Sequence, residues 1–232
     1  MYPKIITNVQ THVPVAALTF DDGPHPVYTP NVLSILKKHS AKATFFMVGE
    51  SASKYPEVVK MVAGAGHTIG NHSWSHPILT AMASRIHRLR QIWACARAIA
   101  PYGKRLFRPP FGMQNLQIRL DALFLMNKAI LWSASAQDWI PQKPEEIAQK
   151  IIDRVSPGTI FLLHDAIYQS EAPQTLWDRG PMLNGLEIAL AELKGRIHFV
   201  TLPELLKAGR TVCNWPIPKD QSHIQPPKFV SV

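Results

Sequence analysis

Apolar and amphipathic stretches alternate along the chain, and this alternation predicts strands separated by helices. Residues 13–18 form an apolar run that is typical of a buried strand. Between residues 29 and 39 apolar side chains recur at helical spacing, and Thr29-Pro30 suits a helix start. The same patterns predict further strands at 42–48, 68–70, 105–108, 129–134, 159–163 and 196–200, and further helices at 56–64, 82–100, 115–126, 144–155, 181–194 and from Pro203.

Strands that alternate with helices indicate an α/β fold with a mostly parallel sheet and helical crossovers. About seven such units suit a closed or nearly closed (β/α) barrel, and a doubly wound open sheet is the alternative. In either fold the loops at the carboxyl ends of the strands carry the site. The chain has 232 residues, of which 46% are hydrophobic, and therefore fits one large domain.

We expect this domain to span residues 13–208. An N-terminal extension at 1–12 precedes it, and a C-terminal tail at 209–232 follows it. The tail is rich in proline and shows little periodicity, so we expect it to lie on the surface or to be disordered.

The first residues lack the apolar core of a secretory signal, and no apolar run approaches the roughly 18 residues of a membrane span. We therefore expect a cytoplasmic location without integral membrane contact, or an exported or cell-wall-associated protein if the sequence is a truncated form. Cys95 and Cys213 are the only cysteines. They indicate no disulfide framework, although a single bridge stays open, and Cys95 reads as a small buried hydrophobe.

The net charge of +9 and the pI near 9.7 permit anionic partners such as phosphate-bearing cell-wall polymers, membrane surfaces or nucleic acid. The basic residues are spread along the chain, however, and no basic run is interleaved with aromatic residues, so we expect no nucleic-acid partner. The densest cluster is interpreted as the solvated face of helix 82–100: Arg85, Arg88 and Arg90. The side chains expected to face inward from this helix are Ile86, Leu89, Trp93 and Ile99.

Two adjacent carboxylates follow the first strand, in the stretch TFDDGPHP at residues 19–26. Neighbouring strand residues point to opposite faces, so Asp21 and Asp22 converge on one site only if the chain turns, and Gly23-Pro24 supplies a turn. Two like charges this close are best tolerated beside a cation or an arginine. Taken alone, the stretch suits a solvated acidic turn equally well.

Two histidines four residues apart follow the strand at 68–70, in the stretch NHSWSHP. His72 and His76 can offer imidazole nitrogens to one metal ion, and Pro77 favours a loop over a helix at this point. As an isolated pair they are more often ordinary polar residues. With Asp22 as a third ligand they leave a coordination position open, which is typical of a catalytic metal.

Three more polar clusters follow later strands. In FRPPFG, Arg108 can bond a carboxylate and the stiff Pro-Pro backbone can present the Phe111 N–H to an oxyanion, although a surface loop is an equal alternative. Asp138 and Trp139 end the strand at 129–134. His164 ends the apolar strand at 159–163, where a charge needs a partner, and alone it is better interpreted as a satisfied core residue.

These five clusters, in this order, resemble the polysaccharide deacetylases of carbohydrate esterase family 4, which share the NodB homology domain. The resemblance covers about residues 13–203 and implies a distorted (β/α) barrel with seven or eight strands. It implies a metal-dependent hydrolase that removes N-acetyl groups from an N-acetylglucosamine-containing glycan, either chitooligosaccharide or peptidoglycan. A relative acting on acetylxylan or on a non-sugar amide, and an inactive carbohydrate-binding relative, are the alternatives.

The resemblance also implies roles for the residues that match the family motifs. Asp21 is expected to be the general base, and Arg108 is expected to hold its carboxylate. The expected ligands of the divalent metal, usually zinc and sometimes cobalt or another ion, are Asp22, His72 and His76.

Further matches concern the leaving group and the acetyl pocket. His164 is expected to be the general acid, with Asp138 tuning it, and Trp139 and Leu162 are expected to line the acetyl pocket. Phe111 occupies a position where the family usually has tyrosine, and its backbone N–H is expected to help bind the oxyanion.

The chain departs from the family in two further places. Ser133 and Ser135 stand where acidic residues are common. The segment 168–179 matches no motif, and it is either a substrate-contacting loop or a variable connection.

Overall fold

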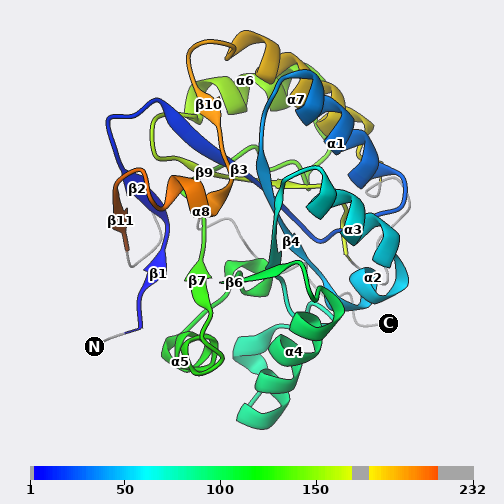
Figure 1. The fold of residues 1–232 in the computed structure, drawn as a ribbon, viewed down its shortest axis with the longest axis vertical. Coiled ribbons are helices and arrows are strands. Elements are labelled where there is room, and N and C mark those ends of the chain that lie inside the picture. Colours follow the sequence, from blue (N-terminus) through cyan, green and yellow to red (C-terminus); the bar gives the residue numbers. More distant parts are fainter. Residues whose placement is uncertain (1–2, 169–177, 214–232) are drawn as a thin grey trace.

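The computed structural model describes residues 3–168 and 178–213, and its strands form a curved sheet surrounded by helices (Figure 1). The strands are β1 Ile5–Ile6, β2 Asn8–Gln10, β3 Val15–Asp21, β4 Ala43–Met47, β5 Thr68–Asn71, β6 Gly103–Phe107, β7 Lys128–Ile130, β8 Ala134–Ser135, β9 Ile160–His164, β10 His198–Phe199 and β11 Arg210–Val212. The helices are α1 Tyr28–Lys38, α2 Gly49–Lys54, α3 Pro56–Gly64, α4 Arg85–Ala98, α5 Leu116–Phe124, α6 Pro144–Arg154, α7 Gly180–Glu192 and α8 Leu202–Leu205, with short 3-10 turns η1 Leu79–Ala81 and η2 Pro110–Gly112.

The main sheet is parallel and curls into a distorted barrel. Within the described residues its strands follow the order β1-β7-β6-β5-β4-β3-β9-β8, and β10 pairs with β3. Only residues 131–133 separate β7 from β8, so one nearly continuous segment pairs with β6 and β1 first and with β9 afterwards. This segment joins the two ends of the path. The barrel prediction is therefore confirmed over the open doubly wound sheet.

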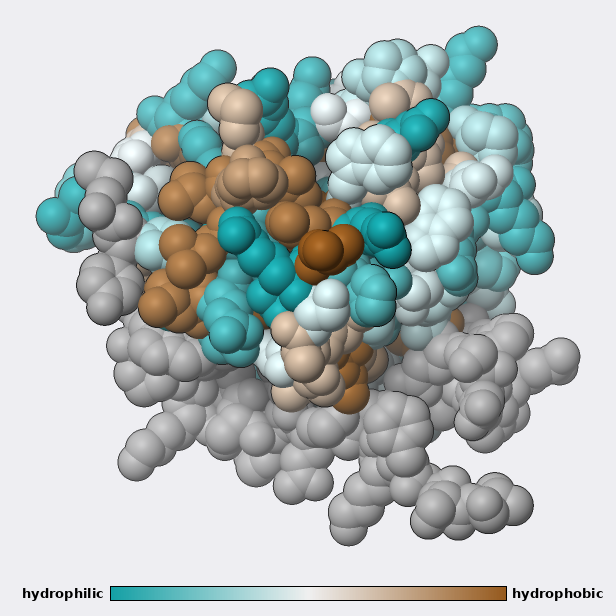
Figure 2. All heavy atoms as spheres, turned by 90° about the horizontal axis from the view of Figure 1, so that it is seen from below, coloured by the Kyte–Doolittle hydropathy of each residue, from teal (hydrophilic) through white to brown (hydrophobic). Residues whose placement is uncertain are grey.

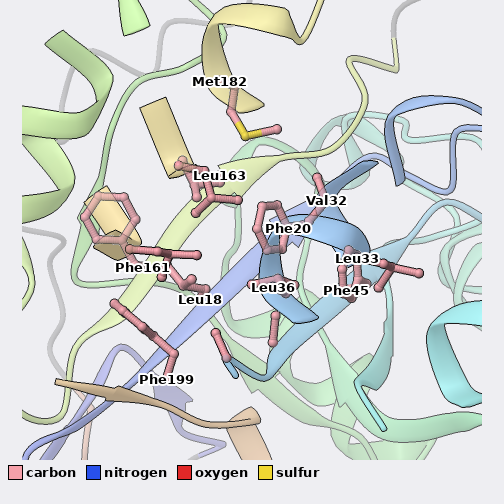
Figure 3. Close-up of a cluster of buried hydrophobic side chains, with 14 of the residues drawn as sticks. Leu18, Phe20, Val32, Leu33, Leu36, Phe45, Phe161, Leu163, Met182 and Phe199 are labelled. Atoms are coloured by element: carbon pink, nitrogen blue, oxygen red, sulfur yellow. The ribbon is translucent and has the colours of Figure 1, made fainter. Parts of the chain in front are cut away.

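Two apolar cores lie on the two faces of strand β3. Successive strand residues point to opposite faces. Leu18 and Phe20 of β3 accordingly pack in the core that Figure 3 shows, between the sheet and helices such as α1 and α7. Ala17 of the same strand packs in the second core, which includes residues from β1, β6, β7, α5 and α8. Asp21 shares the inner face with Ala17, which points the first carboxylate into the barrel mouth.

The orientation of helix α4 differs from the prediction. Ile86 and Trp93 were expected to face inward, but their side chains are 63% and 52% exposed. Arg88 was expected on a solvated face, but it is buried and paired with Asp121 of α5. Apolar residues occur on both sides of this helix, so the pattern alone selected the wrong side for Ile86 and Trp93, whereas Ile99 is buried as expected. The buried residues of α4 are Arg88, Ile92 and Cys95.

Helix α5 leaves much of its apolar surface uncovered on the side next to α4. Apolar side chains gather around polar groups on this face of the molecule (Figure 2). A shallow groove of about 620 Å³ runs there, with the Arg88–Asp121 pair among its walls. The exposed apolar residues of α5 are Leu116, Leu120, Leu123 and Phe124.

Short strands near both termini were not predicted. β1 lies in the expected extension and joins the main sheet beside β7, while β2 pairs with β11 in an antiparallel ribbon. β11 lies in the expected tail, where residues 210–212 form a strand that is mostly exposed at the surface. Residues 214–232 lie outside the described part. Both cysteines are free thiols. None of the described helices combines the length and apolar character that crossing a membrane requires.

Candidate active site

The polar clusters lie at one edge of the sheet, where parallel strands end. Asp21 is the last residue of β3 and pairs in register with His164, the last residue of β9. Asn71 ends β5 and lies opposite Phe107, which ends β6. The carboxyl ends of parallel strands meet at one edge, so the residues that follow these strands are brought together there. The barrel therefore gathers side chains that are far apart in the sequence.

Asp22 turns away from the strand that delivers it. Asp21 still belongs to β3, whereas Asp22 has a φ of 75°. This left-handed conformation takes the second carboxylate out of the strand alternation, so that both carboxylates approach the same histidine. The turn therefore begins at Asp22 itself and not only at the following Gly-Pro pair. Gly23 is needed next because a Cβ there would collide with the carboxylate of Asp165.

Asp22, His72 and His76 form a cluster of potential metal ligands. Their ligand atoms all lie within 4.8 Å of one another. Asp22 Oδ1 is 3.5 Å from His72 Nε2 and 3.2 Å from His76 Nε2. His76 lies in a loop, as expected before Pro77, and its φ of 52° is in the left-handed region. Two imidazoles and one carboxylate that converge in this way suit a divalent cation.

The protonation pattern of this cluster also suits a cation. His72 Nδ1 lies 2.8 Å from the Arg108 carbonyl oxygen, which only accepts, so Nδ1 donates and Nε2 is the ring nitrogen that faces the cluster. Burial lowers the pKa of His76 to about 4, which keeps its ring neutral near pH 7. Burial alone would raise the pKa of Asp22, but His76 and His72 outweigh it and the net pKa lies below the usual value.

An unsatisfied oxygen completes the case for a cation at this point. Asp22 Oδ1 is buried and has no hydrogen-bond partner among the described residues. Buried polar atoms are nearly always paired, and the groups nearest to this oxygen are the Nε2 atoms of His72 and His76, which are themselves potential metal ligands. A divalent cation would satisfy this oxygen and both imidazoles together. The chemistry of the donor set is therefore consistent with a divalent metal.

Arg108 is fully buried and holds Asp21. Its Nη1 donates to Asp21 Oδ1 at 2.7 Å and to Thr19 Oγ1 at 2.8 Å, and its Nη2 donates to the Leu131 carbonyl oxygen at 3.0 Å. The arginine was expected to be able to make a bidentate bond to a carboxylate, but here it divides its donors among three groups. One oxygen of Asp21 is left free of the guanidinium. The aromatic rings packed against the guanidinium are those of Phe46 and Trp132.

His164 is paired with Asp138. His164 Nδ1 lies 3.0 Å from Asp138 Oδ1, and the backbone N–H of His164 donates to Asp138 Oδ2 at 2.9 Å. Burial alone would lower the pKa of His164, but the Asp138 carboxylate outweighs it and the net pKa is raised. The His164 side chain is still 13% exposed, so it is not a fully enclosed core residue. A cationic imidazole that reaches the site is therefore favoured here.

Comparisons with known proteins decide the family. The family model for polysaccharide deacetylase matches residues 8–129. A chitooligosaccharide deacetylase of Azorhizobium caulinodans is 37% identical over 186 residues, which cover 77% of this chain and 88% of the relative. A peptidoglycan-N-acetylglucosamine deacetylase of Bacillus cereus is 34% identical over 202 residues, which cover 84% of this chain and 69% of the relative. The chain belongs to the polysaccharide deacetylase family.

A solved structure agrees with this assignment. The crystal structure of the Bc1960 peptidoglycan N-acetylglucosamine deacetylase matches with a TM-score of 0.78 and 30% identity, covering 89% of this chain and 94% of that one. The protein is therefore a hydrolase of the polysaccharide deacetylase class, and its barrel is the fold of that class.

Two apolar residues of the deacetylase lie beside His164. The ring of Trp139 meets the imidazole edge to face, with centroids 5.3 Å apart. Leu162 is buried and precedes His164 by two residues on β9, so it points to the same inner face. These positions are compatible with walls of a small acyl pocket.

Phe111 lies beside His76, on the side of the site that holds the potential metal ligands. Its φ of 58° is in the left-handed region, and its ring centroid is 4.4 Å from that of His76. The preceding Pro109 and Pro110 lead the chain into this turn. The aromatic ring therefore packs on a metal-ligand candidate, while the usual tyrosine hydroxyl is absent from this deacetylase.

Several contacts of the deacetylase site were not predicted from the sequence. Ser133 Oγ, which stands where acidic residues are common, accepts the Ile160 backbone N–H at 3.2 Å and so ties β9 to the closing segment. The Tyr168 backbone N–H donates to Asp22 Oδ2 at 3.1 Å. Arg179 is buried and forms an ion pair with Asp138.

Tyr168 and Arg179 are the first and last residues of the segment that matched no motif. Residues 169–177 of this segment lie outside the described part, so both interpretations of them stay predictions. The flanking contacts had no clear sequence signal. A single arginine before Gly-Pro usually marks an exposed helix start, and nothing in the local pattern indicates that its guanidinium is buried against a carboxylate.

Proposed function

We propose that this deacetylase removes the N-acetyl group from N-acetylglucosamine units of a glycan, such as a chitooligosaccharide or peptidoglycan. The observation that carries the proposal is the cluster of Asp22, His72 and His76 next to Asp21, whose carboxylate is held by a buried arginine. The relatives named above support the substrate class, because their names specify deacetylation of chitooligosaccharide or peptidoglycan.

Asp22, His72 and His76 would hold the divalent cation, and we propose zinc as its identity, with cobalt as a substitute. Imidazole nitrogen and carboxylate oxygen are common zinc donors, and three protein ligands leave a coordination position open. When bound, such a cation supplies Lewis-acid polarisation of the amide carbonyl and makes water a stronger nucleophile. The residues around the cluster supply the remaining functions.

Asp21 acts as the general base in this proposal. Arg108 fixes its Oδ1, whereas its Oδ2 lies 3.6 Å from His72 Nε2 and so faces the metal-ligand cluster. A water molecule placed between Asp21 and the acetyl carbonyl would transfer a proton to Oδ2 as its oxygen attacks the carbonyl carbon. The fixed orientation means that no carboxylate rotation is needed during this transfer.

His164 acts as the general acid. An amine leaves readily only when its nitrogen is protonated, so the breaking C–N bond needs a proton donor. Asp138 raises the pKa of His164, which keeps the imidazole cationic before transfer. The Nδ1 of His164 is occupied by Asp138, so Nε2 is the nitrogen left to donate.

The remaining residues of the proposal stabilise and enclose the acetyl group. The Phe111 backbone N–H, presented by the turn after Pro110, is proposed to donate to the developing oxyanion. Trp139 and Leu162, which lie beside His164, are proposed to enclose the methyl group. A small apolar enclosure would favour acetyl over longer acyl groups.

Acetate release tests the proposed substrate class. The purified protein would be incubated with chitooligosaccharides, peptidoglycan and acetylxylan, with and without a chelator, and acetate would be quantified. We expect release from an amino-sugar substrate, loss of release after chelation and recovery with Zn²⁺. Metal analysis should find one bound divalent ion per chain. Release only from acetylxylan would reassign the substrate, and no release from any substrate would contradict the proposed activity.

A further inference from the structure

The guanidinium of Arg179 bonds Asp138 and His164, the two residues proposed to protonate the leaving group. Its side chain is 3% exposed. Its Nη1 donates to the Asp138 carbonyl oxygen at 2.8 Å, and its Nε donates to the His164 carbonyl oxygen at 3.1 Å. Its Nη2 forms an ion pair with Asp138 Oδ2. One buried cation therefore contacts the carboxylate and the backbone of both partners.

The two oxygens of Asp138 are divided between different donors. Oδ1 faces the imidazole of His164, while Oδ2 receives the His164 backbone N–H and the Arg179 guanidinium. A carboxylate that is bonded at one oxygen by a rigid guanidinium fork cannot rotate freely about its last bond. The orientation of Oδ1, and through it the orientation of the imidazole ring, is therefore fixed from behind.

The position of Arg179 at the start of α7 makes this contact stable. The Asp178 carboxylate accepts the Gly180 backbone N–H at 2.8 Å and so satisfies one free amide of the first helical turn. Met182, in the same turn, is buried in the outer core. Arg179 therefore lies at a helix start that is held by the Asp178 hydrogen bond and by the packing of Met182, and not in a loose loop.

We propose that Arg179 is a positioning residue for leaving-group protonation, which holds Asp138 and the His164 backbone so that the imidazole keeps one orientation. The proposal rests on the proposed function of His164 as the acid. Arg179 itself is not placed against substrate. Its loss would leave the metal-ligand cluster and Asp21 in place while the imidazole gains freedom to turn.

Leaving-group chemistry distinguishes this role from a purely structural one. The Arg179→Gln variant would be assayed on a chitooligosaccharide and on 4-nitrophenyl acetate, whose phenolate leaves without a proton. We expect kcat for the chitooligosaccharide to fall about 100-fold, the lower range for general-acid catalysis, with KM little changed. We expect kcat for the ester to change less than about threefold, because its departure needs no acid.

Arg88→Gln is the matched control. Arg88 is also a buried arginine that bonds one aspartate and two backbone carbonyls, but it lies between α4 and α5. The control should leave the ratio of the two kcat values unchanged, even if it lowers stability. An equal loss on both substrates in Arg179→Gln, or no loss on the chitooligosaccharide, would overturn the proposal.

A second measurement needs no turnover. The ring N–H shared between His164 Nδ1 and Asp138 should give a slowly exchanging, downfield proton NMR signal in the unaltered protein and in Arg88→Gln. Arg179→Gln should lose this protection, with exchange faster by about tenfold or more for a bond that is no longer oriented. A protected signal in Arg179→Gln would overturn the positioning role. If the unaltered protein releases no acetate but the signal depends on Arg179, the proposed function fails and the positioning role stands.

Discussion

Two buried aspartate–arginine pairs in this molecule differ in how completely the carboxylate is satisfied. Between α4 and α5, Asp121 receives Arg85 Nε at Oδ1 and Arg88 Nε at Oδ2, at 3.0 and 2.7 Å. In the site, Asp21 receives Arg108 at Oδ1 only. Its Oδ2 lies 3.6 Å from the nearest histidine nitrogen, beyond a hydrogen bond. The same chemistry therefore gives a saturated structural pair in one place and, in the other, the aspartate that we propose as the base.

The difference extends to the surroundings of each pair. Among the described residues, most buried side-chain atoms without a hydrogen-bond partner lie in or next to the site: Asp22 Oδ1, Ser73 Oγ, Arg108 Nε and Asp165 Oδ1. Leaving a buried polar atom unpaired costs about 1–3 kcal/mol of stability, which a fold tolerates mainly where the atom has a functional role. Unsatisfied atoms therefore mark the end of the barrel that carries the candidate site more clearly than buried charges do.

The largest expected effect comes from Asp21→Asn. The amide keeps the size of the carboxylate but cannot take a proton, so kcat should fall about 10⁴-fold, the upper range for general-base catalysis. The metal content, measured by elemental analysis, should not change, because Asp22, His72 and His76 are intact. In contrast, His76→Ala should lose the metal. Full activity in either variant would contradict the roles proposed for these residues.

The saturated pair should affect stability rather than catalysis. Arg88→Gln is expected to lower the free energy of unfolding by about 3 kcal/mol, because Asp121 stays buried with only Arg85. Urea titration measures this loss. Arg90→Gln, an exposed arginine on the same helix, is the control and should change stability by less than about 0.5 kcal/mol. A fall in the ratio of kcat for the chitooligosaccharide to kcat for 4-nitrophenyl acetate in Arg88→Gln would contradict a purely structural role of the Arg88–Asp121 pair.

Two histidines show the same contrast between a structural residue and a residue of the site in the direction of their pKa shifts. Burial, aided by Lys42, lowers the pKa of His67 to about 4, whereas Asp138 raises that of His164. His67 Nδ1 accepts the Ala43 backbone N–H at 3.1 Å, which requires a neutral ring. The unfolded chain takes up this proton near pH 6.5 and the folded chain only near 4, so the contribution of His67 is complete above 6.5 and is lost as pH falls toward 4.

His67→Asn removes this titration while keeping an acceptor for the Ala43 N–H. The free energy of unfolding should therefore fall less between about pH 7 and about pH 5 in the variant than in the unaltered protein. Urea titrations at the two pH values measure both losses. Equal losses in the two proteins would show that His67 titrates alike in the folded and unfolded chains.

The smallest expected effect is that of Phe111→Tyr. The substitution restores the hydroxyl that is usual in the family, while the backbone N–H and the left-handed turn are unchanged. We expect kcat/KM for acetate release to change by less than about threefold, because no proposed step uses the ring edge. A change of more than about tenfold would mean that the side chain at the rim of the pocket contributes to catalysis. Phe111 would then have to be counted among the residues that distinguish the site from the structural pair.

Much of the fold was predictable from the sequence because its strands and helices are long enough to show their periods. The run at 13–18 predicted β3, and the alternation of elements predicted the barrel. β1 and β2 escaped detection because two or three residues show no period. The face of α4 was misjudged because apolar residues occur on both sides of it, and only packing selects Ile92 over Ile86.

The site was predictable where residues cluster in short motifs after strands. Asp22 and His76 were both expected near one ion, and the structure places them together. The turn at Asp22 was placed one residue late, because the backbone of an aspartate in the left-handed region carries no composition signal. Arg179 was missed because its partner, Asp138, lies 41 residues earlier and only the fold brings the two together.

The segment that closes the barrel also supports Asp21, the proposed base. Residues 131–133 bridge β7 and β8, and within them the Leu131 carbonyl and the Trp132 ring both hold the Arg108 guanidinium. Closure of the barrel and support of the Asp21 carboxylate through Arg108 therefore depend on the same short segment.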